Sequence, residues 1–197
     1  MFSLNLGGTI MKYPKEEAVK CFDECKQLLS EYNLPDWDSL PSFGLYMDQV
    51  IEFSGSQLGV LSSFNPEAPE ITRPMINNYV KLKMMPAPVD KKYGRVHLAY
   101  ILIICTLKQT LNMSTIQKIL PPDLSEEEVK RTYSSFIKNQ KKAFNYVYGH
   151  VQSVATPILS TEEDNPERID DLLLQVVSSA NVLKYMTEKV INFRQDN

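Results

Sequence analysis

The chain has 197 residues, 43% of them hydrophobic and 23% charged, and its formal net charge is −3. This much apolar side chain excludes an intrinsically disordered protein, and the length allows one substantial domain or a small domain with a helical extension. The longest apolar run, at 97–107, is far shorter than the about 20 residues that a membrane-spanning helix needs, so we expect a buried helix there and no membrane span.

The first half of the chain contains three segments in which apolar residues recur at helical spacing. They predict helices over 14–33, 46–61 and 73–83. Trp37 lies in an irregular stretch between the first two, and its large apolar side chain is expected to anchor that stretch to the core. Thr72 is a suitable N-cap for the third helix.

The second half begins with a short segment at 89–94, which is compatible with a small hairpin or an extended wing. A fourth helix should then carry the apolar run to Leu111, and Ser114 should cap a short fifth helix. Ser125 and Glu128 form a capping-box pattern at the start of a helix of about thirty residues.

That long helix should close at Pro157, and a second long helix should begin near Pro166. Each would be about 45 Å long, which is more than a small domain of about 100 residues can cover. We therefore expect the two helices to pack as a hairpin within 123–197 and to join two copies of the chain as a homodimer. The apolar stripe of the second long helix consists of Ile169, Leu173, Val176, Ala180, Leu183 and Val190.

Charge is distributed unevenly along the chain. Residues 71–118 contain eight basic residues and one acidic residue, a local net charge of +7, whereas the segments before and after them carry −7 and −3. A field this local predicts a local anionic partner such as duplex DNA. The alternative is that these lysines only solvate the surface of a helix.

The predicted third helix divides into two faces when its residues are placed at intervals of about 100°. The face expected to pack holds Ile76, Tyr79, Val80 and the stem of Lys83. The face expected to be free holds Pro74, Asn77, Asn78 and Lys81. Amide and ammonium groups can bond base edges and phosphates, and the basic segment DKKYGR follows at 90–95. A polar helix face beside a basic wing is the layout of a winged helix-turn-helix.

The segments MINNYVKLKMMP, KKYGRVHLAYI and LNMSTIQKIL together resemble the MerR-type winged helix-turn-helix. The matching residues are Tyr79, Lys81, Met84, Met85, Pro86, Tyr93 and Leu98. The stretch 34–120 is also similar to an uncharacterised bacterial family known only as a domain of unknown function. The resemblance implies an all-α fold with a small β wing, a MerR-like domain over 34–120 behind an N-terminal helical segment at 1–33, and a regulatory role in transcription.

Three features depart from the MerR pattern. Asn77 and Asn78 replace an Arg-Tyr pair, so this position offers shorter and uncharged contacts. Lys83 stands where the pattern has glycine, so the left-handed turn there would be strained or differently shaped. The gap between the second and third predicted helices is also longer than the three or four residues typical of a helix-turn-helix.

These observations together predict a DNA-binding transcriptional regulator. The residues predicted to contact duplex DNA are Arg73, Asn77, Asn78, Lys81, Lys91, Lys92, Tyr93 and Arg95. Cations of the wing should reach the phosphate backbone, and Asn77 and Lys81 should reach base edges. The alternative is a helical protein-interaction or ligand-sensing module on the same scaffold without DNA contacts, which Asn77, Asn78 and Lys83 would permit.

Motifs for catalysis are missing from the sequence. It has no phosphate-binding loop and no dinucleotide fingerprint, and its two histidines, His97 and His150, are expected to be structural. Cys105 should lie in the core. Cys21 and Cys25 are expected to be small buried side chains, with a metal-ligand pair or a thiol sensor as the alternative. We predict no enzyme activity, no metal and no cofactor, and a cytoplasmic location because three unpaired cysteines fit a reducing compartment; a small-molecule effector is left unidentified.

Overall fold

The computed structural model of the chain describes residues 15–64, 70–160 and 166–193. In these residues the secondary structure is helical throughout, which confirms the predicted all-α class. The helices are α1 (Lys15–Glu31), α2 (Met47–Phe64), α3 (Arg73–Lys81), α4 (Arg95–Leu107), α5 (Met113–Ile119), α6 (Glu126–Leu159) and α7 (Pro166–Phe193).

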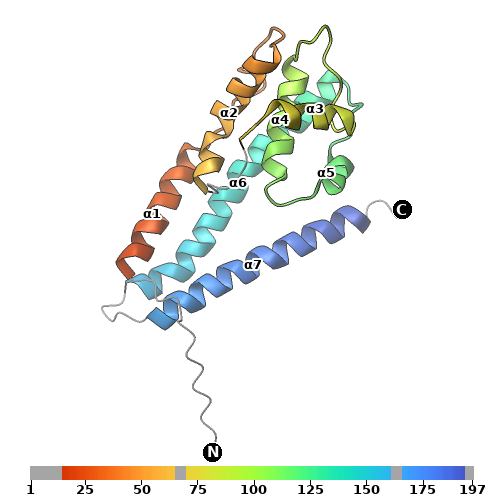
Figure 1. Cartoon of the computed structure of the whole chain (residues 1–197). Coiled ribbons are helices and arrows are strands. Elements are labelled where there is room, and N and C mark those ends of the chain that lie inside the picture. Colours follow the sequence, from red (N-terminus) through yellow and green to blue (C-terminus); the bar gives the residue numbers. More distant parts are fainter. Residues whose placement is uncertain (1–14, 65–69, 161–165, 194–197) are drawn as a thin grey trace, which may run out of the picture.

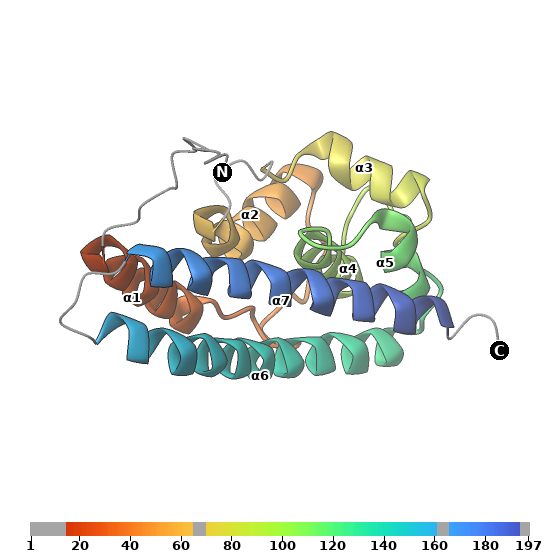
Figure 2. The ribbon, with the colours of Figure 1, turned by 90° about the horizontal axis from the view of Figure 1, so that it is seen from below.

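Helix α4 lies at the centre of the fold. It packs against α2 and α6, and all residues from 97 to 105 are buried, as the apolar run predicts. Helices α3 and α5 lie with α4 at one end of the molecule, whereas α1 lies beside the later turns of α6 at the other end (Figure 1). Figure 2 shows α3 along one edge and α6 along the opposite edge, with α4 and α5 between them.

The irregular stretch between α1 and α2 is anchored through Trp37, as predicted. Trp37 is buried and meets the ring of Tyr133 edge to face, with ring centroids 6.3 Å apart. The Tyr133 hydroxyl donates a hydrogen bond of 2.8 Å to the carbonyl of Pro35, and burial raises the pKa of this hydroxyl. The first turns of α6 therefore belong to the same core as α2 and α4.

Local capping signals predicted three N-caps, of which Thr72 and Ser125 are correct. Ser125 and Glu128 form the predicted capping box at the start of α6. The N-cap of α5 is Asn112 and not Ser114, because the Asn112 side chain accepts the backbone N–H of Thr115 at 2.9 Å. This earlier cap also shortens α4, which ends at Leu107 before Leu111 is reached.

The prediction that Pro157 closes α6 was wrong. Pro157 lies inside the helix, which continues to Leu159, and the N–H of Ser160 still reaches the carbonyl of Thr156 at 2.9 Å. A proline this close to a C-terminus removes one hydrogen bond only, so the last turn survives.

The expected β wing is not formed as strands in the described residues. Two isolated antiparallel bridges stand in its place, Leu45 with Tyr93 and Val89 with Lys92. Between the latter two residues the chain reverses in two residues, which leaves no length for a ladder.

Helices α6 and α7 form the predicted hairpin, and α7 begins at Pro166. The end of α7 reaches α5, where the Lys118 ammonium group donates to Asn192 at 2.8 Å. Ile169 and Leu172, near the start of α7, are buried, but the large apolar residues of its later turns are exposed. None of the described helices combines the length and the apolar composition that crossing a bilayer requires.

Candidate nucleic-acid interface

Helix α3 is held at both ends by backbone capping. Thr72 is its N-cap and Pro74 lies in its first turn, as predicted. At its C-terminus, Met84 N–H bonds to the Tyr79 carbonyl at 2.8 Å and Lys83 N–H to the Val80 carbonyl at 3.0 Å, the two bonds of a Schellman motif. The motif fixes where α3 ends and where the chain turns.

Lys83 occupies the left-handed position of this motif, with φ of 52°. Glycine is the usual residue there, and a side chain costs about 1 kcal/mol, so the predicted strain is present. The left-handed backbone also places Lys83 on the exposed surface, although its stem was expected to pack. Lys83 is therefore a surface cation that the helical projection placed on the wrong face, because the helix ends before it.

The two faces of α3 are as predicted. Ile76 and Tyr79 are fully buried, and burial raises the pKa of the Tyr79 hydroxyl. Asn77, Asn78 and Lys81 are exposed. We refer to these three residues as the free face of α3.

Residues 89–92 form a tight turn in place of the wing. The N–H of Lys92 bonds to the Val89 carbonyl at 2.8 Å, and both central residues have positive φ, 49° at Asp90 and 60° at Lys91. Positive φ at both positions is the signature of a type I′ turn, which connects antiparallel segments with the least splay. Lys91 and Lys92 are both exposed at this turn.

His97 fastens this turn to α4. The Gly94 N–H donates to Nδ1 of His97 at 3.0 Å, so the ring proton lies on Nε2, which donates to the Ala87 carbonyl at 3.2 Å. Burial lowers the pKa of His97, which favours this neutral form. Both ring nitrogens are thus satisfied, in agreement with the structural role predicted for this histidine.

The 89–92 turn lies against the N-terminal end of α2. The Lys92 ammonium group lies 5.5 Å from the centre of the Tyr46 ring. Gly44 makes this approach possible, since a Cβ on it would come within 2.8 Å of Lys92 Cβ. Leu45 and Tyr93 exchange two backbone hydrogen bonds of 2.9 Å. The turn therefore has a fixed position relative to α2.

Helix α3 is tied to the same place. Arg73, at its first position, forms an ion pair with Asp48 in the first turn of α2. The Arg73 charge partly offsets the rise that burial causes in the pKa of Tyr93. The start of α3 and the 89–92 turn are thus neighbours, which brings the two predicted contact regions together.

Two of the predicted contact residues have other roles. Tyr93 is only 4% exposed and meets His97 edge to face, so its ring cannot stack on a base. Arg95 donates to the carbonyls of Leu40 at 2.9 Å and Asp38 at 3.2 Å, so its guanidinium fastens the stretch before α2. Arg73 stays exposed, but Asp48 neutralises part of its charge.

Sequence reasoning missed two residues at this surface. Lys83 is exposed beside the free face of α3, and its position after the last helical residue could have indicated this. Tyr46 is an exposed aromatic ring beside Lys92, which no spacing in the sequence signals. The surface formed by the free face of α3, Lys83 and the exposed lysines of the 89–92 turn is referred to below as the α3 surface.

Other candidate chemistry is sparse in the described residues. They contain no cluster of three or more His, Cys, Asp or Glu side chains that could hold a metal ion. Cys105 lies in the core as predicted, but Cys21 is exposed and Cys25 only partly buried, because that side of α1 faces away from the core. Burial and the neighbouring Cys21 raise the pKa of Cys25, which disfavours its reactive thiolate form.

A family model described as a domain of unknown function, DUF1836, matches residues 35–146. The match spans α2 to α5 and the first part of α6, and so includes the whole α3 surface. It agrees with the resemblance to a domain of unknown function, whereas the link to MerR-type regulators stays a prediction. Comparisons with curated proteins and with solved structures gave no match.

Proposed function

The chain belongs to the DUF1836 family, a domain of unknown function, and from the geometry of the α3 surface we propose that it is a cytoplasmic transcriptional regulator that binds duplex DNA. The observation that carries the proposal is the junction of two elements. The start of α3 and the lysine-bearing 89–92 turn are both held at the start of α2, and both elements lie in the segment of net charge +7.

The dimensions of α3 suit the major groove of DNA. An α-helix with its side chains is about 10–12 Å in diameter, and the major groove is about 12 Å wide. Asn77 and Lys81 would face base edges, since an amide can pair with adenine and an ammonium group can bond guanine. Lys83, Lys91 and Lys92 would lie over the phosphates and set the register of the helix.

The order of elements resembles the order in a MerR-type domain, and this resemblance supports the same proposal. Helix α2, helix α3, the 89–92 turn, α4, α5 and the long α6 follow one another as in that motif. The connection between the first two helices departs from the motif: α2 ends at Phe64 and α3 begins at Arg73, which is longer than in a usual helix-turn-helix. Recognition would therefore depend on α3 and the turn more than on a standard two-helix unit.

We further propose that the regulator is a homodimer joined by α7. One row of residues along α7 follows alternating spacings of three and four positions, as the a and d positions of a coiled coil do. The repeat consists of Ile169, Leu172, Val176, Ser179, Leu183, Met186, Val190 and Phe193. Its first members are buried in the chain, but Leu183 and Met186 are 57% exposed and Val190 and Phe193 68% exposed. We call these last four residues the α7 seam.

A second copy of the chain is the occupant that fits the α7 seam. The seam continues a stripe that is already packed within the chain, so another helix of the same kind can extend the same packing. A two-fold axis would cover both seams at once, and it would place two α3 surfaces on one side for two half-sites. Exposed apolar side chains in such a row are uncommon on a monomer.

The test is the salt dependence of binding to duplex DNA. Binding to random-sequence duplexes, followed by fluorescence anisotropy, should weaken steeply between about 50 and 200 mM salt, with a slope of about −0.9 for each phosphate contacted. Replacing Lys91 and Lys92 by alanine should make the slope shallower by the amount that about two phosphate contacts contribute. The matched control replaces Lys141 and Lys142, an exposed lysine pair on α6, and should leave the slope unchanged.

The alternative is a helical protein-interaction or ligand-sensing module without DNA binding, which the exposed α7 seam would serve. If no duplex binds at low salt, the proposal of DNA binding fails and this alternative replaces it. Equal losses from the Lys91/Lys92 and Lys141/Lys142 pairs would mean that binding depends on total charge and not on the α3 surface. If the Lys91/Lys92 pair alone changes the slope, sequencing of the genomic fragments that the protein retains would identify its preferred site.

A further inference from the structure

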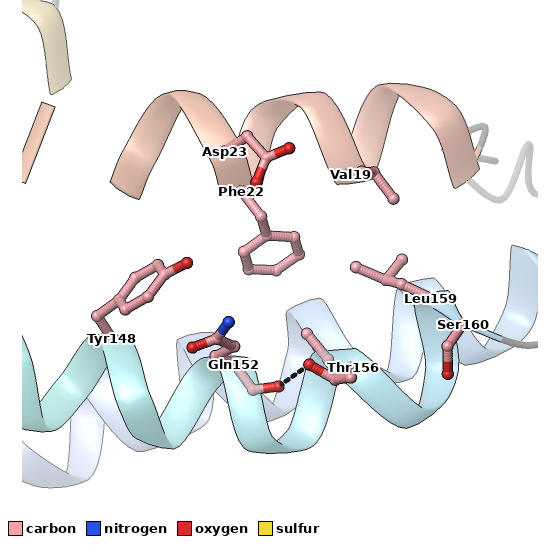
Figure 3. Close-up of a pocket in the computed structure, with 9 residues that line it drawn as sticks. Val19, Phe22, Asp23, Tyr148, Gln152, Thr156, Leu159 and Ser160 are labelled. Carbon is pink, nitrogen blue, oxygen red and sulfur yellow. Dashed lines mark hydrogen bonds between the residues drawn. The ribbon is translucent and has the colours of Figure 1, made fainter. Parts of the chain in front are cut away.

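A cavity lies between α1 and the last turns of α6, at the end of the molecule opposite to the α3 surface. It has a volume of about 270 Å³, and its described lining residues belong to these two helices and to Ser160, the C-cap of α6. This is close to the lower limit of about 300 Å³ for small-molecule pockets. Figure 3 shows the Phe22 ring of α1 reaching into the gap toward α6.

The walls of the cavity are mainly apolar. Val19 and Phe22 of α1 face Leu159 of α6 across it (Figure 3), and Ala155 also lines it. Tyr148 adds a second aromatic ring, and its hydroxyl points into the gap (Figure 3). A ligand with an apolar body would remove these surfaces from water, at about 25 cal/mol for each Å².

The polar groups of the cavity are one carboxylate, one amide and three hydroxyls, so Asp23 is the one charged side chain among the described lining residues. Asp23 brings a carboxylate, and the side-chain amide of Gln152 faces the gap (Figure 3). The Thr156 hydroxyl is already used, because it donates to the Gln152 carbonyl at 2.8 Å. The described lining residues include no Lys, Arg or His to balance Asp23.

A second source of negative potential is α6 itself. Gln152, Thr156 and the C-cap Ser160 belong to its last turns, where the carbonyl ends of the peptide dipoles add up to about half a negative charge. Asp23 and this helix end favour the same sign of ligand. The Phe22 and Tyr148 rings favour it as well, since a cation is attracted to the face of an aromatic ring within about 6 Å.

We propose that this cavity binds a small organic cation with an apolar body, such as an arylalkyl ammonium ion. The ammonium group would lie near Asp23 and the aromatic rings, and the apolar body would lie against Val19 and Leu159. This inference does not depend on DNA binding, because the cavity lies outside the α3 surface and its test measures the ligand alone.

The test uses three probes of similar size and different charge, titrated into the full chain by calorimetry. They are phenethyltrimethylammonium, its neutral analogue dimethyl phenethyl carbinol, and the anion phenylpropionate. The cation should bind about tenfold more tightly than the alcohol, and the anion should not bind measurably. Equal binding of cation and alcohol, or no binding of the cation at millimolar concentration, would overturn the proposal.

Two variants locate the site. Asp23→Asn should weaken binding of the cation about tenfold and leave the affinity for the alcohol unchanged. The matched control is Glu24→Gln, which removes the same charge from the adjacent position, where Glu24 pairs with Lys20, and should change neither affinity beyond about twofold. If Asp23→Asn and Glu24→Gln have equal effects, the cation is attracted by α1 as a whole and the proposal is wrong.

Val19→Trp fills the cavity from its exposed rim, where α1 tolerates a larger side chain. It should abolish binding of the cation while the thermal unfolding midpoint stays within a few degrees of the wild type. Undiminished binding to this variant would place the ligand elsewhere and would also overturn the proposal.

Discussion

Helices α3 and α7 are both exposed along part of their length, but they expose different chemistry. Helix α3 buries Ile76 and Tyr79 and presents amides and an ammonium group to solvent. Among the residues of α7 whose burial is described, Ile169 and Leu172 are buried, and the apolar α7 seam is left uncovered. Exposing polar groups to water carries no free-energy penalty, so the α3 surface can stay exposed in the absence of a ligand. Exposing a row of apolar side chains is unfavourable, so the α7 seam favours a permanent partner.

The largest effect should come from the buried side of α3. Tyr79→Ala should reduce the free energy of unfolding by about 3–5 kcal/mol, because it leaves a cavity beneath α3. Asn77→Ala, two positions earlier on the free face, should change stability by less than about 0.5 kcal/mol. Urea unfolding followed by circular dichroism measures both. Equal losses would mean that the two faces of α3 are not distinct.

Tyr79→Phe refines this comparison. It keeps the ring and removes only a hydroxyl that lies 3.8 Å from the Cys105 sulfur, a weak contact. The loss should be below about 1.5 kcal/mol. A loss as large as that of Tyr79→Ala would assign the stability to the hydroxyl and not to packing.

The second effect concerns α7. Leu183→Glu together with Val190→Glu should convert the proposed dimer into a folded monomer, because burying carboxylates in the interface costs several kcal/mol. Asn181→Glu, on the opposite side of the helix, should leave the dimer intact. Sedimentation velocity gives the mass of each variant. A wild-type chain that sediments as a monomer at tens of micromolar, where an obligate dimer would be complete, contradicts the proposal.

A smaller effect separates two basic residues near the 89–92 turn. Arg95→Ala should lower stability by about 1–2 kcal/mol, because its two hydrogen bonds to the stretch before α2 are lost, and should change DNA affinity little. Lys91→Gly should do the reverse. Glycine relieves the positive φ and stabilises by about 0.5–1 kcal/mol, while the loss of one cation weakens duplex binding.

Thermal unfolding and anisotropy titrations on the same preparations would separate these two roles. The assignment would be wrong if Arg95→Ala reduced the affinity for DNA as much as Lys91→Gly does and left the unfolding midpoint unchanged. Arg95 would then contact DNA and not the Leu40 and Asp38 carbonyls.

The smallest effect is a dependence on pH through His97. Its pKa in the folded chain lies below the ordinary value of 6.5, so the unfolded chain binds the proton more readily. Neutral His97 therefore makes its full contribution to the free energy of unfolding above pH 6.5. This free energy should decline as the pH falls below that value. Protonation of Nδ1 would also remove the bond from Gly94.

Urea midpoints measured on either side of this pH give the slope. His97→Gln keeps a side chain that can cap Gly94 without titrating, so it should flatten the decline. His150→Gln, at an exposed position on α6, serves as the control and should retain it. An unchanged decline in His97→Gln would assign the pH dependence to other groups.

The sequence could predict much of the fold but only part of the site. Periodicity and caps located the helices, the inward ring of Tyr79 and the outward Asn77, because these signals connect residues within a turn or two of each other. The roles of Tyr93 and Arg95 could not be predicted in this way. Their partners are Leu45, Leu40 and Asp38, which lie about fifty residues earlier in the chain.

Apolar periodicity by itself determined the helices and the two faces of α3, and the count of charges determined the position of the basic segment. Only the tertiary structure decided that the wing is a two-residue turn, that Pro157 stays inside α6, that α1 and α6 leave a cavity at Asp23, and that the stripe of α7 is covered in its first half alone. The physical reason is that the helical period fixes the direction in which each side chain points. Whether that side chain is buried depends on which element, distant in the sequence, packs against it.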